Sequence, residues 1–180
     1  MPNSPGQIGF TPVEPGHYPL LRQWLRAPHV REWWGEVEEE LGFIRDMVEG
    51  RDTTRPFLIT LDEEPVGYIQ YWFIGHHQND AWGEKAPWLK ALPADAVGVD
   101  LTIGEAAWLS KGVGSAALSA FVARLRADGF GTIVIDPDRE NLRAVRAYEK
   151  AGFRPVPELE GRTGKVLIMQ HHEYANETLS

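Results

Sequence analysis

The sequence of 180 residues contains no cysteine. This absence excludes disulfide bonds, thiolate metal ligands and a cysteine nucleophile. The chain also has no apolar run of the length that a membrane-spanning segment requires, and residues 1–6 show neither the basic start nor the apolar stretch of a signal peptide. We therefore expect a cytoplasmic protein that has no membrane as a partner.

Positive charge is also scarce, because 18 Lys and Arg stand against 26 Asp and Glu, which gives a formal net charge of -8 at pH 7. A nucleic-acid backbone binds basic surfaces, so the sequence predicts no nucleic-acid partner. An acidic protein is compatible with a cationic ligand instead. The adjacent histidines at 76–77 and 171–172 would point to opposite faces if they lay on strands, so we expect no metal site.

Hydrophobic periodicity predicts one mixed α/β domain over residues 1–180, with flexible tails at 1–7 and 173–180. The expected strands cover residues 8–13, 57–61, 66–73, 97–103, 131–135, 153 onward and 165–171, and the expected helices cover residues 17–26, 36–49, 115–128 and 141–151. Pro12 in the first of these strands indicates an edge position.

Three further stretches are interpreted from their composition. In residues 28–35, P-H-V-R-E-W-W-G, we expect Trp33, Trp34 and Gly35 to form a compact aromatic turn. Residues 74–96 are interpreted as an irregular loop, a kind of segment that is usually functional or mobile in a compact domain. The acidic run in the second helix is interpreted as its solvated face, and its members are Glu36, Glu38, Glu39 and Glu40.

The stretch from Val97 to Ala117 carries the first functional signal. A strand with alternating apolar residues leads into L-S-K-G-V-G, residues 109–114, and this loop opens a helix. Gly112 and Gly114 let the backbone approach a ligand closely, and the amides of the first helical turn attract an anion. The alternative is a helix start with small residues for close packing. The loop also matches G-x-G-x-x-A, but eight residues, 104–111, separate it from the strand, whereas a dinucleotide-binding loop turns directly off its strand.

Residues 136–153, D-P-D-R-E-N-L-R-A-V-R-A-Y-E-K-A-G-F, together with this loop, resemble the GNAT superfamily of acetyl-CoA-dependent N-acetyltransferases. E-W-W-G at 32–35 and G-V-D at 98–100 resemble its aminoglycoside 6'-N-acetyltransferase branch. The resemblance covers residues 8–170. It implies a single GNAT domain, a mixed sheet flanked by helices, and acetylation of the 6'- or 2'-amine of an aminoglycoside-type antibiotic, kasugamycin included. Such an enzyme confers resistance and is expected as a monomer or homodimer.

The resemblance also implies where acetyl-CoA would bind. Its pantetheine arm would pair along Leu101, Thr102 and Ile103, and its pyrophosphate would lie on a loop formed by Lys111, Gly112, Val113, Gly114 and Ser115. Many family members carry Arg or Gln where this chain has Leu109, so the phosphate contact would come from backbone amides. Asn141 resembles a residue near the pantetheine, and it is equally explained as a helix N-cap. The strands carrying Asp100 and Ile135 separate in this family, so that a backbone amide there can face the thioester carbonyl.

Two residues are the expected catalytic groups. Asp100 would take a proton from the amine, and Tyr148 would protonate the departing thiolate, as the resemblance implies. The alternatives are an aspartate on the polar face of a strand and an ordinary core tyrosine. Asp136 would bind a second substrate ammonium, or else cap the following helix or shape the D-P turn.

Aromatic residues supply the expected walls of a cationic sugar site, because aromatic faces hold both sugar rings and ammonium groups. The substrate-binding candidates are Trp33, Trp34 and Trp82, with Trp88 as a further aromatic, and each one is also a candidate core residue. Three other functions stay open at this point: a siderophore-biosynthetic acyltransferase with a hydroxylamine acceptor, a dinucleotide-binding module, and a non-catalytic acyl-CoA sensor.

Overall fold

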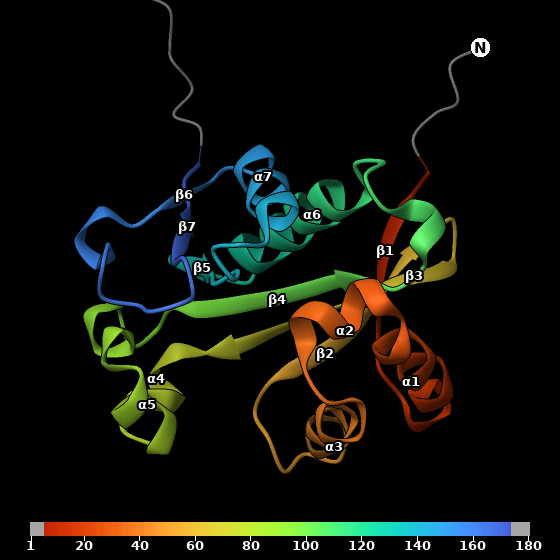
Figure 1. Cartoon of the computed structure of the whole chain (residues 1–180), viewed down its shortest axis with the longest axis horizontal. Helices are drawn as coiled ribbons and strands as arrows, with labels where there is room; N and C mark the ends of the chain where they lie inside the picture. Colours follow the sequence, from red (N-terminus) through yellow and green to blue (C-terminus); the bar gives the residue numbers. More distant parts are fainter. Residues whose placement is uncertain (1–5, 174–180) are drawn as a thin grey trace, which may run out of the picture.

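A seven-stranded mixed sheet organises the chain, and the computed structural model describes it over residues 6–173 (Figure 1). The sheet order is β1-β2-β3-β4-β5-β7-β6, and only the β4–β5 pair among these strands is parallel. The strands are β1 Ile8–Pro12, β2 Arg55–Leu61, β3 Glu64–Phe73, β4 Val97–Ile103, β5 Ile133–Ile135, β6 Phe153–Pro155 and β7 Met169–His171. The predicted fold class is confirmed, and β1, which contains Pro12, lies at the edge of the sheet.

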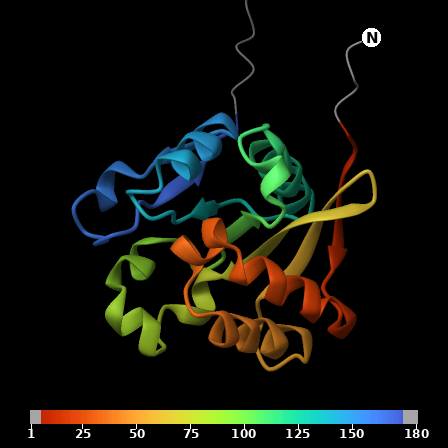
Figure 2. The same cartoon turned by 45° about the vertical axis from the view of Figure 1, so that its right-hand side comes forward.

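Helices cover both faces of the sheet (Figures 1 and 2). On one face lie α1 Tyr18–Arg26, α2 Pro28–Trp34 and α3 Val37–Val48, and on the other lie α6 Val113–Ala127 and α7 Leu142–Lys150. The described residues also form four 3-10 helices: η1 Pro15–His17, η2 Pro87–Ala91, η3 Ala106–Trp108 and η4 Pro157–Leu159. Phe121 and Phe153 are fully buried under α6 and α7, whereas Trp24 and Leu41 pack on Leu58 and Tyr68 under α1 and α3.

Two stretches without an expected regular structure are helical. The prediction of an aromatic turn is wrong, because residues 28–34 form α2, which begins with Pro28 at its first position, where a missing N–H costs nothing. The stretch 74–96 contains α4 Ile74–His77, α5 Ala81–Lys85 and η2, and Asp80 caps α5 through the amides of Trp82 and Gly83. His76 and His77 therefore lie on a helix, not on a strand.

Two turns also differ from the predictions. The expected strands at 57–61 and 66–73 leave a four-residue turn between them, D-E-E-P, but the β2–β3 hairpin closes through two residues, Asp62 and Glu63, with φ of 50° and 70°. The last two strands are short, because residues 156–168 form η4 and turns around Gly161 and Gly164. The predicted flexible tails lie mostly outside the described residues. Within these, Gln7 exchanges two hydrogen bonds with Asp62.

One irregularity of the sheet determines where a ligand can enter. The parallel ladder between β4 and β5 ends at the pair Val99 and Ile135, but β4 continues to Ile103. The second half of β4 thus has one edge beside a gap that β5 does not fill. Among the described helices, none has the length and apolar character needed to cross a membrane.

Candidate active site

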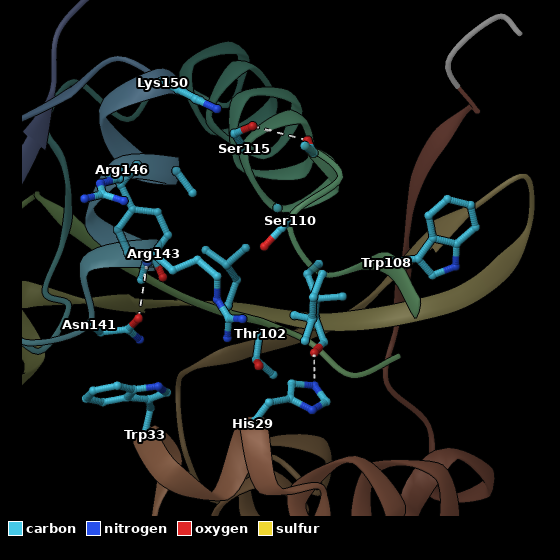
Figure 3. Close-up of a pocket in the computed structure, with 18 of the residues that line it drawn as sticks. His29, Trp33, Thr102, Trp108, Ser110, Ser115, Asn141, Arg143, Arg146 and Lys150 are labelled. Carbon is cyan, nitrogen blue, oxygen red and sulfur yellow. Dashed lines mark hydrogen bonds between the residues drawn. The ribbon is translucent and has the colours of Figure 1, made fainter. Parts of the chain in front are cut away.

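The open edge of β4 presents backbone groups to this gap. In a strand the N–H and C=O of alternate residues point to the same side. The amide of Val97 donates to Thr132 on the β5 side, and the amide of Gly104 donates to Val66 on the β3 side. By this alternation, Leu101 and Ile103 direct their backbone groups toward the gap. The Ile103 carbonyl lies 2.8 Å from His29 Nε2 of α2 (Figure 3).

The start of α6 lies beside this edge and has the geometry of an anion cradle. Gly112 is its N-cap with φ of +80°, in the left-handed region, and no side chain caps the first-turn amides. A Cβ at Gly112 would meet no atom within 4 Å, and a Cβ at Gly114 would only touch Ile103 at 3.8 Å. Both glycines line a pocket of about 470 Å³. The backbone is thus open to a ligand at the positive end of the α6 dipole.

Three basic side chains of α7 face the same pocket. Arg143, Arg146 and Lys150 follow one another at helical spacing and line it opposite the α6 loop (Figure 3). The sequence analysis missed them, although their spacing was a usable signal. We refer to this cavity as the basic pocket; besides these groups it is lined by His29, Thr102, Trp108, Leu109, Ser110 and Ser115, among others. Its charge and its helix terminus suit a phosphate-bearing ligand.

Two of the expected cofactor residues do not line the basic pocket. Lys111 places its ammonium 5.9 Å from the ring centroid of Trp108, and its side chain is not part of the lining. Val113 is 7% exposed and packs in the core between α6 and the sheet. The other predicted positions on β4 and on the loop line it: Leu101, Thr102, Ile103, Gly112, Gly114 and Ser115.

A second pocket of about 270 Å³ carries the opposite charge. It contains four carboxylate side chains from three segments of the chain, and we refer to it as the acidic pocket. Its carboxylates are Glu40 of α3, Asp100 of β4, and Asp136 and Asp138 after β5. The prediction that Glu40 belongs to a solvated face is wrong. Glu40 is partly buried against this pocket, and burial, with the charges of Glu39 and Asp100, raises its pKa to about 7.

Asp100 and Asp136 form a close pair in the acidic pocket. Burial raises the pKa of Asp100, while the hydrogen bond from Gln70 Nε2, at 2.9 Å from Asp100 Oδ2, lowers it. Burial and the adjacent charge of Asp100 raise the pKa of Asp136 well above its usual range. Asp100 is therefore the member of the pair that ionises more readily, which is the order that a proton acceptor requires. Asp136 does not cap α7, because Asn141 does.

The two pockets share one wall. Its members, which line both pockets, are Trp33, Trp34, Leu101, Asn141, Ala144 and Tyr148. Tyr148 is 9% exposed, and burial together with the charges of Asp100 and Asp136 raises its pKa, so its hydroxyl stays protonated as a donor. Asn141 is a helix N-cap and also lies in the candidate site. Its side chain accepts a hydrogen bond from the amide of Ala144 at 3.2 Å, and it lines both pockets.

Trp82 lies in neither pocket. It packs 4.9 Å from Trp72, 5.0 Å from His77 and 6.2 Å from Trp88, measured between ring centroids, in the cluster formed by α4, α5 and η2. Trp88 is buried in the same cluster. Of the tryptophans predicted to bind substrate, only Trp33 and Trp34 therefore lie in the wall between the pockets.

A parallel strand pair opens beside a glycine loop, with a basic pocket on one side and an acidic pocket on the other. This arrangement defines a class of protein. The family model for the acetyltransferase (GNAT) domain matches residues 14–160, and the chain belongs to this family. The predicted identity as an acetyl-CoA-dependent N-acetyltransferase is thereby confirmed, and the glycine loop is not that of a dinucleotide-binding fold.

Individual relatives extend this assignment. The chain is 33% identical over 141 residues to the aminoglycoside N(6')-acetyltransferase type 1 of Klebsiella pneumoniae, which covers 74% of this chain and 67% of that protein. It is 25% identical over 159 residues to the N(6)-hydroxylysine O-acetyltransferase of Escherichia coli, covering 83% and 48%. Among solved structures, AAC(6')-Ib in complex with paromomycin and acetyl-CoA superposes with a TM-score of 0.77 at 27% identity, covering 97% of this chain and 98% of that one.

Proposed function

We propose that this chain transfers the acetyl group of acetyl-CoA to a primary amine of an aminoglycoside-type amino sugar, at the 6'- or the 2'-position, and thereby confers resistance to that antibiotic. The observation that carries the proposal is that a basic and an acidic pocket meet at Tyr148. An anionic donor and a cationic acceptor would each find the complementary charge, and their reacting groups would meet at the shared wall.

The basic pocket is the proposed site of acetyl-CoA. The amides at the start of α6 and the side chains of Arg143 and Arg146 would bind its phosphates. The Leu101 carbonyl and the backbone groups of Ile103 at the open edge of β4 would pair with the amides of the pantetheine arm. Thr102, Ser115 and Asn141 line the same cavity, whereas the predicted contacts of Lys111 and Val113 receive no support from it.

The acidic pocket is the proposed site of the acceptor. The Asp100 carboxylate would take one proton from the substrate ammonium, and the free amine nitrogen would then bond to the thioester carbonyl carbon. The Leu101 N–H would stabilise the negative oxygen that develops. As the carbon–sulfur bond breaks, Tyr148 would give its hydroxyl proton to the sulfur, and the nitrogen would release its remaining extra proton to solvent. Tyr148 would regain a proton from solvent and Asp100 would release the one it took, so that the products are the N-acetyl amide, coenzyme A and one proton.

The shared aromatic wall would select the acceptor. Trp33 and Trp34 offer faces for a sugar ring, and Asp136 would hold a second polar group of the acceptor beside Asp100. Since acetyl-CoA is supplied in the cytoplasm, this function implies a cytoplasmic enzyme. Whether it acts as a monomer or a homodimer stays a prediction, to be checked by light scattering.

Thiol release tests this proposal directly. Purified protein and acetyl-CoA are combined with kanamycin, ribostamycin, kasugamycin, a polyamine and an N-hydroxylysine, and free coenzyme A is measured for each. We expect release with at least one aminoglycoside, and NMR of the product then identifies the acetylated amine. Coenzyme A binding without release from any aminoglycoside would overturn the proposal and favour a non-catalytic acyl-CoA sensor or another acceptor.

A hydroxylamine acceptor is the second candidate, and the similarity to the N(6)-hydroxylysine O-acetyltransferase favours it. The acidic pocket favours the first candidate, because its ionised carboxylates, Asp100 among them, would repel the carboxylate of an amino-acid acceptor. The pH dependence distinguishes the two. A hydroxylamine is already neutral near pH 7, so its reaction would not require Asp100 as a base.

A further inference from the structure

A chain of hydrogen bonds runs from the core to Asp100. Tyr68 and Gln70 lie on the same face of β3, and the sheet register places Gln70 directly across from Asp100. The Tyr68 hydroxyl donates to Gln70 Oε1 over 2.6 Å, and Gln70 Nε2 donates to Asp100 Oδ2 over 2.9 Å. The chain has a direction, because each donor points toward Asp100.

Tyr68 itself cannot contact a substrate. It is 2% exposed and lines neither pocket, and its ring packs edge-on against Trp34 with the centroids 5.7 Å apart. Its hydroxyl also lies 3.7 Å from Met47 Sδ, a weaker acceptor than the amide oxygen. Burial and the nearby charges of Asp100 and Glu40 raise the pKa of Tyr68 well above its usual range, so the hydroxyl keeps its proton and remains a donor.

The orientation of the Gln70 amide decides what Asp100 faces. An amide has a donor end and an acceptor end, and only the donor end stabilises a carboxylate. The Tyr68 hydroxyl donates to the acceptor end, Gln70 Oε1, and so keeps this oxygen on the side away from Asp100. Without this hydroxyl, the amide could rotate by half a turn, and its oxygen would then accept a hydrogen bond from a protonated Asp100.

We propose that Tyr68 is a positioning residue for the acceptor reaction: its hydroxyl fixes the Gln70 amide with the NH₂ group toward Asp100, which keeps Asp100 available as a carboxylate. The role of Asp100 as proton acceptor rests on the proposed function. The orientation effect does not, since it concerns the titration of Asp100 in the protein alone.

The other titratable groups around Asp100 make this donor important. They are Asp136 and Asp138 after β5, Glu40 on α3 and Tyr148 on α7, together with Tyr68 itself on β3. The charges that Asp136 and Glu40 acquire on ionisation oppose ionisation of Asp100. The hydrogen bond from Gln70 opposes the effect of these charges, so its loss raises the pKa of Asp100.

The test is Tyr68→Phe, which removes one oxygen from a buried ring. The pKa of Asp100 is measured by ¹³C NMR on protein labelled at the aspartate carboxyls, with its signal assigned from Asp100→Asn. We expect this pKa to rise by about 0.5 to 1 unit, the equivalent of one hydrogen bond. The acidic limb of kcat/KM for the acceptor then moves to higher pH by the same amount, while the KM for acetyl-CoA is unchanged.

Two further variants separate this role from a structural one. Tyr71→Phe makes the same change on the opposite face of β3, where Tyr71 packs on Phe57 and Phe121, and it should leave the Asp100 titration unchanged. Gln70→Leu should raise the pKa of Asp100, and adding Tyr68→Phe to it should have no further effect. An unchanged pKa in folded Tyr68→Phe, or full additivity in the double variant, would overturn the inference. Absence of thiol release by the wild type would instead overturn the proposed function alone.

Discussion

The two pockets that meet at Tyr148 are built from different material. The basic pocket depends largely on main-chain groups, namely the amides at the start of α6 and the open edge of β4, with Arg143 and Arg146 at its surface. The acidic pocket depends on side chains from α3, β3, β4 and the segment after β5, held partly buried beside one another. A pocket made of backbone groups tolerates a change of side chain, such as one at Leu109. A pocket made of interacting carboxylates does not.

The comparison predicts that the largest effect comes from the acidic pocket. Asp100→Asn removes the proton acceptor but retains the shape of the side chain, so we expect turnover to fall by roughly 10² to 10⁴. The affinity for coenzyme A, measured by calorimetry, should stay the same because the basic pocket is intact. Asp95→Asn, at an exposed position outside both pockets, is the matched control. Retention of full turnover by Asp100→Asn would remove Asp100 from the mechanism.

A smaller effect is expected when the backbone of the basic pocket is changed. Gly112→Ala places a methyl group in the open space of the cradle and strains a residue with φ of +80°. We expect coenzyme A to bind on the order of tenfold more weakly, because backbone approach is blocked.

Gly129→Ala supplies the control for this strain. Gly129 follows the other end of α6 with φ of +98°, and a Cβ there also meets no atom within 4 Å. Both variants should lose similar stability, roughly 1 to 2 kcal/mol, but only Gly112→Ala should lose affinity. Equal coenzyme A affinities in the two folded variants would mean that the cradle is not the phosphate site.

The backbone-built pocket is also the part that the sequence predicts best. Alternating apolar residues identify β4, and the spacing of Gly112 and Gly114 identifies the helix start, because both signals are local. The basic face of α7 was missed for another reason. Periodicity predicts that residues 141–151 form a helix, but it does not show which face of the helix borders a cavity. Leu142 is 58% exposed, and the neighbouring Arg143 lines the pocket.

The side-chain-built pocket could be predicted only in part. Asp100 and Asp136 were found, but Glu40 was interpreted as a solvated residue, because the sequence of α3 does not show what lies opposite. Glu40 lines the pocket together with Trp33 and Trp34 of α2, a stretch where the sequence predicts a turn. Tertiary contacts between segments far apart in the chain determine the burial of these side chains, and local sequence patterns do not show such contacts.

Glu40→Gln is the variant with the smallest expected effect on the reaction, and it distinguishes the two pockets most sharply. Its pKa of about 7 in the folded protein exceeds the ordinary value of 4.5. The folded state therefore holds a proton that the unfolded chain releases between these pH values, and the stability gained from neutral Glu40 is lost as pH rises from 4.5 through 7. Glu40→Gln lacks this dependence. We expect the variant to gain about 1 to 2 kcal/mol relative to the wild type above pH 7, after allowance for its partial solvent exposure.

Urea unfolding at pH 5, 6, 7 and 8 measures this difference, with Glu32→Gln at an exposed position of α2 as the control. The same variant should raise the acceptor KM about threefold at pH 8, where Glu40 is ionised, and leave the acetyl-CoA KM unchanged. The stability and the acceptor affinity thus move in opposite directions, because the acidic pocket holds a charge that destabilises the empty site and attracts a cation. A gain in stability that does not depend on pH would show that Glu40 is not buried against this pocket.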